Sequence, residues 1–156
     1  PFQPEIAKMN WEEFEATFGI QAASLEALTS AAVEVMRRFQ IRNLVITCAT
    51  QGILAFTPQG FYRAVAPTQE VVNAAGAGDA VSSALVWRLS LGDDWLEALR
   101  WAAAAAAAVV RTAGTADCYW QDVQSIYPDV VLTFFGSSIA TLNNSSHLEI
   151  TPKEGV

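Results

Sequence analysis

The sequence predicts an α/β fold, and three observations carry that prediction. Apolar residues recur at helical spacing over residues 24–39, which indicates an amphipathic helix. Residues 43–48, NLVITC, form a short apolar run with β-branched side chains, which is typical of a strand buried on both faces. Two further apolar runs, at 53–57 and 61–65, enclose the turn sequence PQG and predict a hairpin. Helices and short strands that alternate in this way indicate an α/β protein.

Two helices are predicted before the first of these strands. Residues 10–18 form a short helix with Asn10 as its N-cap, acidic residues in its first turn and Gly19 at its end. Residues 24–39 form a longer helix with Ser24 as its N-cap. Two arginines near the end of the longer helix suit the negative end of its dipole.

A glycine-containing loop and two helices follow the hairpin. Residues 70–72, EVV, are predicted to be a short strand that enters the loop. Residues 79–91 form a helix that ends at Gly92, and residues 93–112 form another that begins with two aspartates. The alanine run at 102–108 belongs to this second helix, because alanine is the best helix former. Its small side chains allow another element to approach closely.

The C-terminal part of the chain divides into a folded portion and a polar tail. Residues 122–128 predict a short helix that a proline stops, and residues 129–135 predict a last strand. Residues 136–156 are polar and show no periodicity, so we expect them to be poorly ordered. Residues 1–135 are therefore expected to make up one folded unit.

Composition excludes several classes of partner. The chain has 156 residues, 52% of them hydrophobic, and a net charge of −7. Its acidity argues against nucleic acid and against an anionic membrane surface as partners. The longest apolar run, at 102–110, is far shorter than the ~20 residues that span a bilayer. No basic and then apolar leader opens the sequence, and the two cysteines form no metal-binding pattern, so a cytoplasmic protein is expected.

The stretch NAAGAGDAVSS, at residues 73–83, predicts an anion site. A glycine-rich turn before a helix exposes unpaired N–H groups, to which the helix dipole adds positive charge. Gly76, Ala77 and Gly78 have little side chain to keep a phosphate away from these groups. Asp79 would repel an anion unless it has a chemical task, such as taking a proton from an alcohol that attacks the phosphate. The alternative is that Asp79 caps the helix and the glycines only shape a turn.

Four segments in order resemble one enzyme family. VVNAAGAGDAVSSAL resembles the second signature of the ribokinase-like (PfkB) carbohydrate kinases, and AKMNWEEFEATFG looks like their vKPNxxEfexlfG segment. VITCATQGILAF is similar to their nucleotide-side strand and turn, and EALRWAAAAAAAVVRTAGTAD to the helix after the signature. The stretch from TAGTAD to DVQSIYPDV resembles the end of the domain in the 1-phosphofructokinase and tagatose-6-phosphate kinase branch of the family. The resemblance extends over almost all of residues 5–132.

The resemblance implies a fold and a reaction. The fold would be the three-layer α/β/α arrangement of ribokinase, of which this chain would supply the C-terminal, ATP-side half. The reaction would be phosphoryl transfer from ATP, with Mg²⁺, to a hydroxyl of a sugar or sugar phosphate. Asp79 would be the catalytic base, and the loop from Gly76 through Ala77 to Gly78 would be the anion hole.

Other site residues also follow from the resemblance. Lys8 and Asn10 match positions near the nucleotide phosphates, and Glu13 matches an acid that helps to organise Mg²⁺ through water. Thr47 and Gly52 match the nucleotide-side strand and turn. The alternatives are a helix cap for Asn10, a solvated acid for Glu13, and an ordinary strand and turn for the other two.

The sequence departs from the family pattern in two ways. The first glycine of the nucleotide-side turn is Ala49 here, and alanine does not take a positive φ cheaply, so a shifted turn and weaker nucleotide binding are expected. The chain is also about half the length of the family, and by the resemblance the sugar pocket and the lid would belong to the other, N-terminal half. We therefore expect an exposed sheet edge, with self-association through it. A non-catalytic nucleotide-binding remnant stays open as the second hypothesis beside an active kinase.

Overall fold

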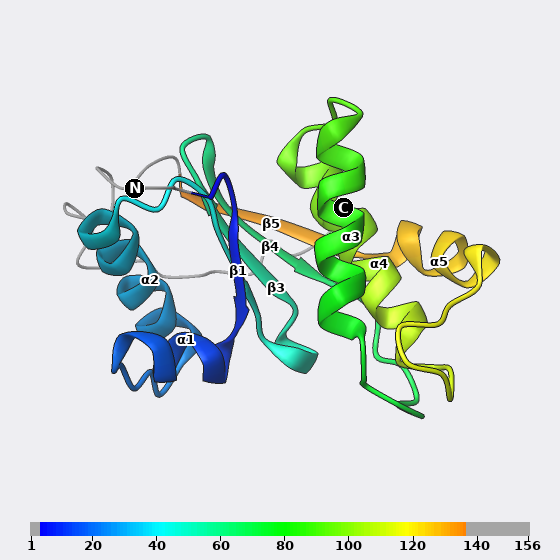
Figure 1. The fold of residues 1–156 in the computed structure, drawn as a ribbon. Helices are drawn as coiled ribbons and strands as arrows, with labels where there is room; N and C mark the ends of the chain where they lie inside the picture. Colours follow the sequence, from blue (N-terminus) through cyan, green and yellow to red (C-terminus); the bar gives the residue numbers. More distant parts are fainter. Residues whose placement is uncertain (1–3, 137–156) are drawn as a thin grey trace, which may run out of the picture.

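The computed structural model describes residues 4–136 and places one mixed sheet between two layers of helices (Figure 1). The strands follow one another across the sheet in the order β1-β2-β3-β4-β5. The first two strands are parallel, and every other neighbouring pair is antiparallel. The strands are β1 (Ala7–Asn10), β2 (Leu44–Thr47), β3 (Ile53–Thr57), β4 (Gly60–Val65) and β5 (Val131–Gly136).

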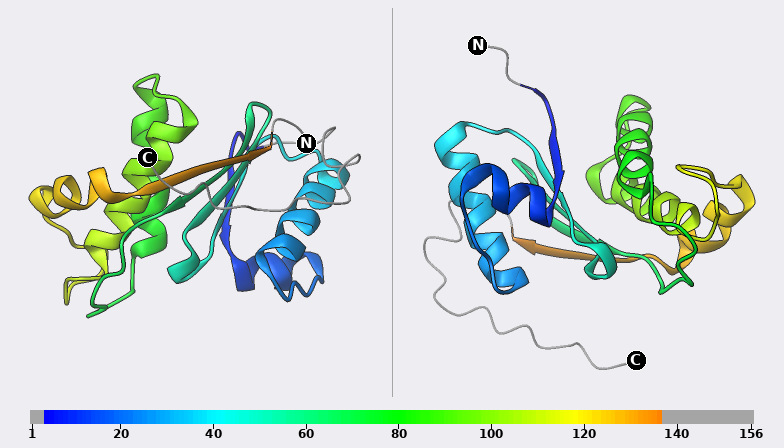
Figure 2. Two further views of the ribbon diagram at one scale, coloured as in Figure 1. Left: turned by 180° about the vertical axis from the view of Figure 1, so that it is seen from behind. Right: turned by 60° about the horizontal axis from the view of Figure 1, so that its bottom comes forward.

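Helices cover both faces of the sheet, as the two views in Figure 2 show. One layer contains α1 (Trp11–Phe18) and α2 (Leu25–Phe39). The opposite layer contains α3 (Ala77–Ser90), α4 (Trp95–Val109) and α5 (Trp120–Ile126). Two 3₁₀ turns, Ala49–Gln51 and Tyr127–Asp129, complete the regular structure. The expected α/β/α layering is confirmed.

Strands β2 and β3 send alternate side chains into two separate cores. Leu44, Ile46 and Phe56 face α1 and α2, whereas Val45 and Ala55 face α3 and α4. Both faces of these strands are therefore apolar, which explains why the sequence shows continuous apolar runs and no alternation.

Several predicted helix ends are confirmed. Asn10 and Ser24 are N-caps whose side chains accept from the N–H three residues later, and Asp94 does the same for α4. Gly19 ends α1 in the left-handed conformation, with φ of 65°. The helix after the glycine loop begins two residues earlier than predicted, at Ala77, and the last strand spans Val131–Gly136. The predicted tail at 136–156 lies, apart from Gly136, outside the described residues.

One predicted strand is absent, and one observed strand was not predicted. Residues 70–72 form no strand, because the N–H groups of Val72 and Asn73 both donate to the carbonyl of Val110 at the end of α4, at 2.8 and 3.2 Å. Strand β1 is not predicted, because its sequence AKMN contains two polar residues in four. Its extended form follows from parallel pairing with β2, in which Ala7 lies opposite Leu44 and Asn10 opposite Thr47.

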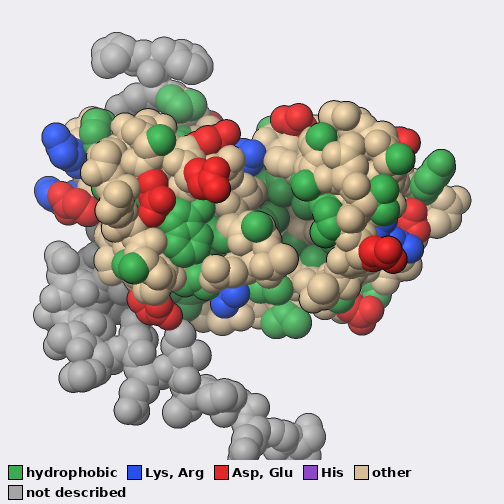
Figure 3. Space-filling view, turned by 90° about the horizontal axis from the view of Figure 1, so that it is seen from below, with side chains coloured by type: hydrophobic (Ala, Val, Ile, Leu, Met, Phe, Trp, Pro, Cys, Tyr) green, Lys and Arg blue, Asp and Glu red, His purple; other side chains and the backbone are tan. Residues whose placement is uncertain are grey.

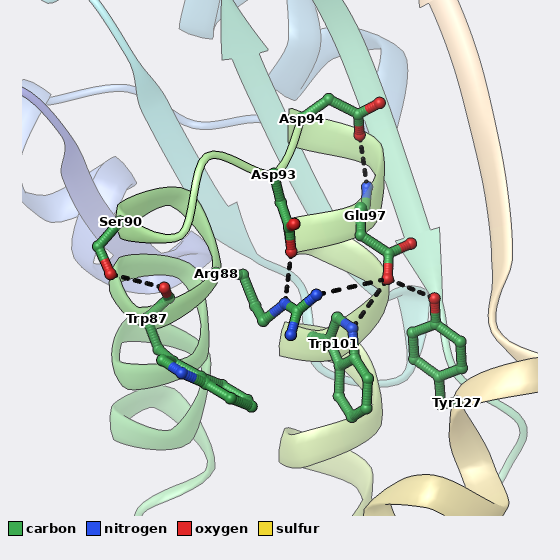
Figure 4. A network of polar contacts seen from close by, with 8 residues as sticks. All are labelled: Trp87, Arg88, Ser90, Asp93, Asp94, Glu97, Trp101 and Tyr127. Atoms are coloured by element: carbon green, nitrogen blue, oxygen red, sulfur yellow. Dashed lines mark hydrogen bonds and ion pairs between the residues drawn. The ribbon is translucent and has the colours of Figure 1, made fainter.

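A polar network joins α3 to α4 at the end of α3 far from the glycine loop (Figure 4). One oxygen of Glu97 accepts from the indole N–H of Trp101 at 2.9 Å and from the hydroxyl of Tyr127. Arg88 of α3 pairs with Asp93 and lies over the Trp101 ring, 5.0 Å from its centroid. Burial and the contact with Glu97 raise the pKa of the Tyr127 hydroxyl. The network ties the C-terminal end of α3 to the start of α4 and to Tyr127.

Candidate functional site

A cleft of about 780 Å³ opens where the parallel strands β1 and β2 end. Asn10 and Thr47, the last residues of these strands, lie at its base, which is the edge where α/β sheets usually bind ligands. The 3₁₀ turn and its flanking residues, 48–52, form one wall, and the first turn of α3 and the last turns of α4 form the other. Seen from below, hydrophobic side chains gather in the hollow between the two lobes (Figure 3).

The glycine loop in front of α3 is fixed by the segment that follows α4. Gly76 is the N-cap of α3 with φ of 86°, and a Cβ there would lie 2.4 Å from the N of Ala116. Only glycine fits this position. Ala116 N–H donates to the carbonyl of Ala75 at 3.0 Å. The Asn73 side chain accepts from Ala75 N–H and donates to the carbonyl of Ala113, at 2.9 and 3.1 Å.

The start of α3 presents positive charge to the cleft. The helical ladder begins with Ala80 N–H, which donates to the Gly76 carbonyl at 2.9 Å. The N–H groups of Gly78 and Asp79 precede that ladder, so they can donate to a ligand. Lys8 reaches the same place from β1, since its Nζ lies 2.7 Å from where a Cβ on Gly78 would be. A lysine ammonium and a helix N-terminus together favour an anion. Ala77 and Gly78 line the cleft.

Asp79 is exposed in the first turn of α3, directly after the cleft-lining Gly78. The alternative that it caps the helix does not hold, because the N-cap is Gly76 and no side-chain cap bond is formed there. Asp79 does not line the cleft, although its neighbour Gly78 does. The other part of the alternative, that a glycine shapes the turn, is correct for Gly76.

Asn10 and Glu13 form a capping box at the start of α1. The Asn10 side chain accepts from Glu13 N–H and the Glu13 carboxylate accepts from Asn10 N–H, both at 2.7 Å. Asn10 lines the cleft and Glu13 does not. Residues 4–136 contain no group of three or more His, Cys, Asp or Glu side chains that could hold a metal. The cap foreseen for Asn10 is thus present, and Glu13 also has a structural task.

The 3₁₀ turn keeps a glycine-like shape although it contains an alanine. Ala49 has φ of 47°, and the N–H of Gly52 donates to the Ala49 carbonyl at 3.1 Å. Ala49 therefore occupies a left-handed conformation that it adopts at some energetic cost, and the expected shift of the turn stays a prediction. Gly52 itself has φ of 93°, and a Cβ there would lie 2.2 Å from the carbonyl oxygen of Ala64. Thr47 is the last residue of β2 and lies two residues before Ala49.

The apolar wall of the cleft was not foreseen. It consists largely of small side chains on one face of α4, at i, i+3, i+4 and i+7: Ala103, Ala106, Ala107 and Val110. The prediction that the alanine run allows close packing is confirmed, because α4 packs against α3 and β4 and Ala102, Ala104 and Ala108 are fully buried. Helical spacing of the small residues is the signal present in the sequence, but it does not distinguish a packed face from one that leaves space for a ligand.

Neither cysteine is a nucleophile at neutral pH. Cys48 lines the cleft but is 5% exposed, and burial raises the pKa of its thiol to about 11. The pKa of the Cys118 thiol is also raised, by burial and by the nearby carboxylates of Asp117 and Asp122. Both thiols therefore favour the protonated form at pH 7. The charged side chains that line the cleft are the carboxylates of Glu12 and Glu15, and Lys8 lies beside Gly78 at the helix start.

Within residues 4–136, none of the helices combines the length and the apolar character needed to traverse a lipid bilayer.

Known proteins resemble this chain in sequence and in fold. The profile described as "pfkB family carbohydrate kinase" matches residues 2–122. The bifunctional protein HldE of Nitrobacter winogradskyi is 36% identical over 108 residues, which are 69% of this chain and 22% of that protein. ATP-dependent 6-phosphofructokinase isozyme 2 of Escherichia coli K12 is 26% identical over 123 residues, which are 79% of this chain and 40% of that protein.

A solved structure shows the same arrangement of strands and helices. Phosphofructokinase-2 from Escherichia coli, in complex with potassium, matches with a TM-score of 0.74 at 25% identity, over 81% of this chain and 41% of that chain. The chain spans less than half the length of these relatives. Because the family profile covers most of the sequence, and the fold agrees with it, this chain belongs to the pfkB family of carbohydrate kinases.

Proposed function

We propose that this chain forms the nucleotide-binding half of an ATP-dependent kinase that phosphorylates a hydroxyl of a sugar or sugar phosphate. The observation that carries the proposal is the cleft itself, which combines an apolar alanine wall with a positively charged helix start. An apolar wall suits a flat nucleobase, and the free N–H groups and Lys8 suit its phosphates. The cleft volume, about 780 Å³, is of the size that binds small ligands.

Asp79 is the proposed catalytic base. Its exposed carboxylate follows the anion-binding loop directly, so an acceptor hydroxyl beside it would also lie beside the transferring phosphoryl group. The carboxylate takes the hydroxyl proton as the oxygen attacks phosphorus, while Gly76, Ala77 and Gly78 stabilise the phosphoryl oxygens with their backbone. Glu13 is the acid proposed to reach Mg²⁺ through water, and Glu12 and Glu15 of the same helix line the cleft. Such a donor set fits Mg²⁺ that is bound mainly by water and phosphate oxygens.

Replacement of Asp79 by Asn tests this assignment. In the full-length protein we expect turnover to fall by about 10³-fold, because the amide cannot accept the proton, while ATP affinity stays within about threefold. Turnover would be measured as ATP consumption with fructose 1-phosphate, fructose 6-phosphate and tagatose 6-phosphate, and affinity by calorimetry. Asp129→Asn is the matched control, since Asp129 is equally exposed but lies beyond α5. Undiminished turnover in Asp79→Asn would remove Asp79 from the role of base.

The second candidate is a nucleotide-binding module without turnover. It is favoured by Ala49, whose φ of 47° puts an alanine in the left-handed region within the turn that lines the cleft. ATP binding without ATP consumption by this chain, together with consumption by a longer version, would assign binding to this half and catalysis to the whole. Self-association through the free edge of β1, and a cytoplasmic location, stay predictions; sedimentation velocity tests the first.

A further inference from the structure

The cleft wall formed by residues 48–52 is held from behind by a side chain that does not line the cleft. Arg63 lies on β4, opposite Leu54 of β3, and its Nε donates to the carbonyl of Gln51 at 2.9 Å. We infer that Arg63 is a positioning residue that keeps this turn in the shape that binds the nucleotide. This inference rests on the nucleotide site proposed above. Arg63 is absent from the lining of the cleft, so any effect it has on the ligand is indirect.

The bond from Arg63 gives a partner to a carbonyl that has none inside the turn. Inside the turn, Gln51 N–H donates to the Cys48 carbonyl at 2.9 Å and Gly52 N–H donates to the Ala49 carbonyl at 3.1 Å. The last carbonyls of a helical turn have no partner within it, and Gln51 is the last residue of this one. A guanidinium donor gives this carbonyl a charge-assisted bond, which is stronger than one to a neutral group.

The turn requires such support because Ala49 is in the left-handed region. Its φ of 47° is unfavourable for a residue with a Cβ, so the turn has a local tendency to relax. Relaxation would move Cys48, Ala49 and Thr50, which all line the cleft. The Arg63 bond, two residues after Ala49, opposes that movement. A glycine at position 49 would remove the tendency and with it the need for Arg63.

This reasoning leads to a double-mutant test with ATP as the probe. Arg63→Met should raise the dissociation constant of ATP at least fivefold, and Arg63→Lys should raise it less, because lysine retains one donor. The amides of Gln51 and Gly52 should exchange with deuterium at least tenfold faster in Arg63→Met. In the double variant Ala49→Gly with Arg63→Met, the dissociation constant should return to within about twofold of Ala49→Gly alone. A merely structural role of Arg63 predicts no such rescue.

The control is Arg37→Met on α2, where Arg37 pairs with Glu34 on the surface at 2.6 Å. It should leave both ATP affinity and amide exchange unchanged. Normal ATP binding by Arg63→Met would overturn this inference and leave the proposed nucleotide site intact. Weakened binding that Ala49→Gly fails to rescue would have the same meaning. If the unmodified chain does not bind ATP, the proposed nucleotide site falls and this inference falls with it.

Discussion

The two faces of the sheet differ in the size of the side chains that cover them. Between the sheet and helices α1 and α2, the core contains Phe14, Phe56 and Phe61, all fully buried, and the last two rings lie 5.3 Å apart. On the other face, α4 contributes mainly alanines. Large rings fill the space between layers, whereas small side chains bring a helix close and leave room wherever no other side chain enters. Both faces therefore bury a core, and the second also supplies the alanine wall of the cleft.

Loss of a ring on the first face should have the largest effect. Phe61→Ala removes a fully buried side chain that also contacts Phe135, so we expect the free energy of unfolding to fall by about 3–5 kcal/mol. Urea denaturation followed by circular dichroism measures it. Phe39→Ala is the control, because that ring is 50% exposed and its loss should cost less than about 1 kcal/mol. Equal losses in the two variants would contradict the idea that burial of the ring decides its contribution to stability.

A larger side chain on the second face should affect binding more than folding. Ala106→Leu points an isobutyl group into the cleft, so the dissociation constant of ATP should rise about tenfold, equivalent to about 1.4 kcal/mol. The melting temperature should change little, since the group enters empty space. Its neighbour on α4 supplies the control: Ala105 does not line the cleft, and Ala105→Leu should bind ATP normally. Unchanged affinity in Ala106→Leu would show that the nucleotide lies elsewhere.

The smallest change in stability is expected at the 3₁₀ turn that follows β2. Cys48 packs in the phenylalanine core and also lines the cleft, and Ala49 follows it with φ of 47°. Ala49→Gly relieves the left-handed alanine but increases the entropy of the unfolded chain, so a net gain of about 0.5–1 kcal/mol in unfolding free energy is expected. Thermal denaturation would detect it. A loss of stability would mean that the alanine is not strained.

Local signals account for most of the correct predictions. The caps at Asn10 and Ser24, the left-handed Gly19 and the hairpin turn each depend on residues a few positions apart, and each is present in the structure. The glycine loop was also recognised locally, since Gly76, Ala77 and Gly78 precede and open a helix. Predictions failed where long-range contacts decide. Strand β1 is extended because β2 lies beside it, and residues 70–72 are tied to the end of α4 instead of to a strand.

By itself, the sequence determined the α/β class, the helix termini and the chemical character of the loop before α3, because these depend on neighbouring side chains and on backbone freedom at single positions. The tertiary structure alone decided that Lys8 reaches Gly78, that Glu13 is engaged by Asn10, and which alanines of α4 face the cleft and which are packed. Such features depend on how layers distant in sequence come together. Packing sets the distance between those layers, and a pattern along one segment carries no information about it.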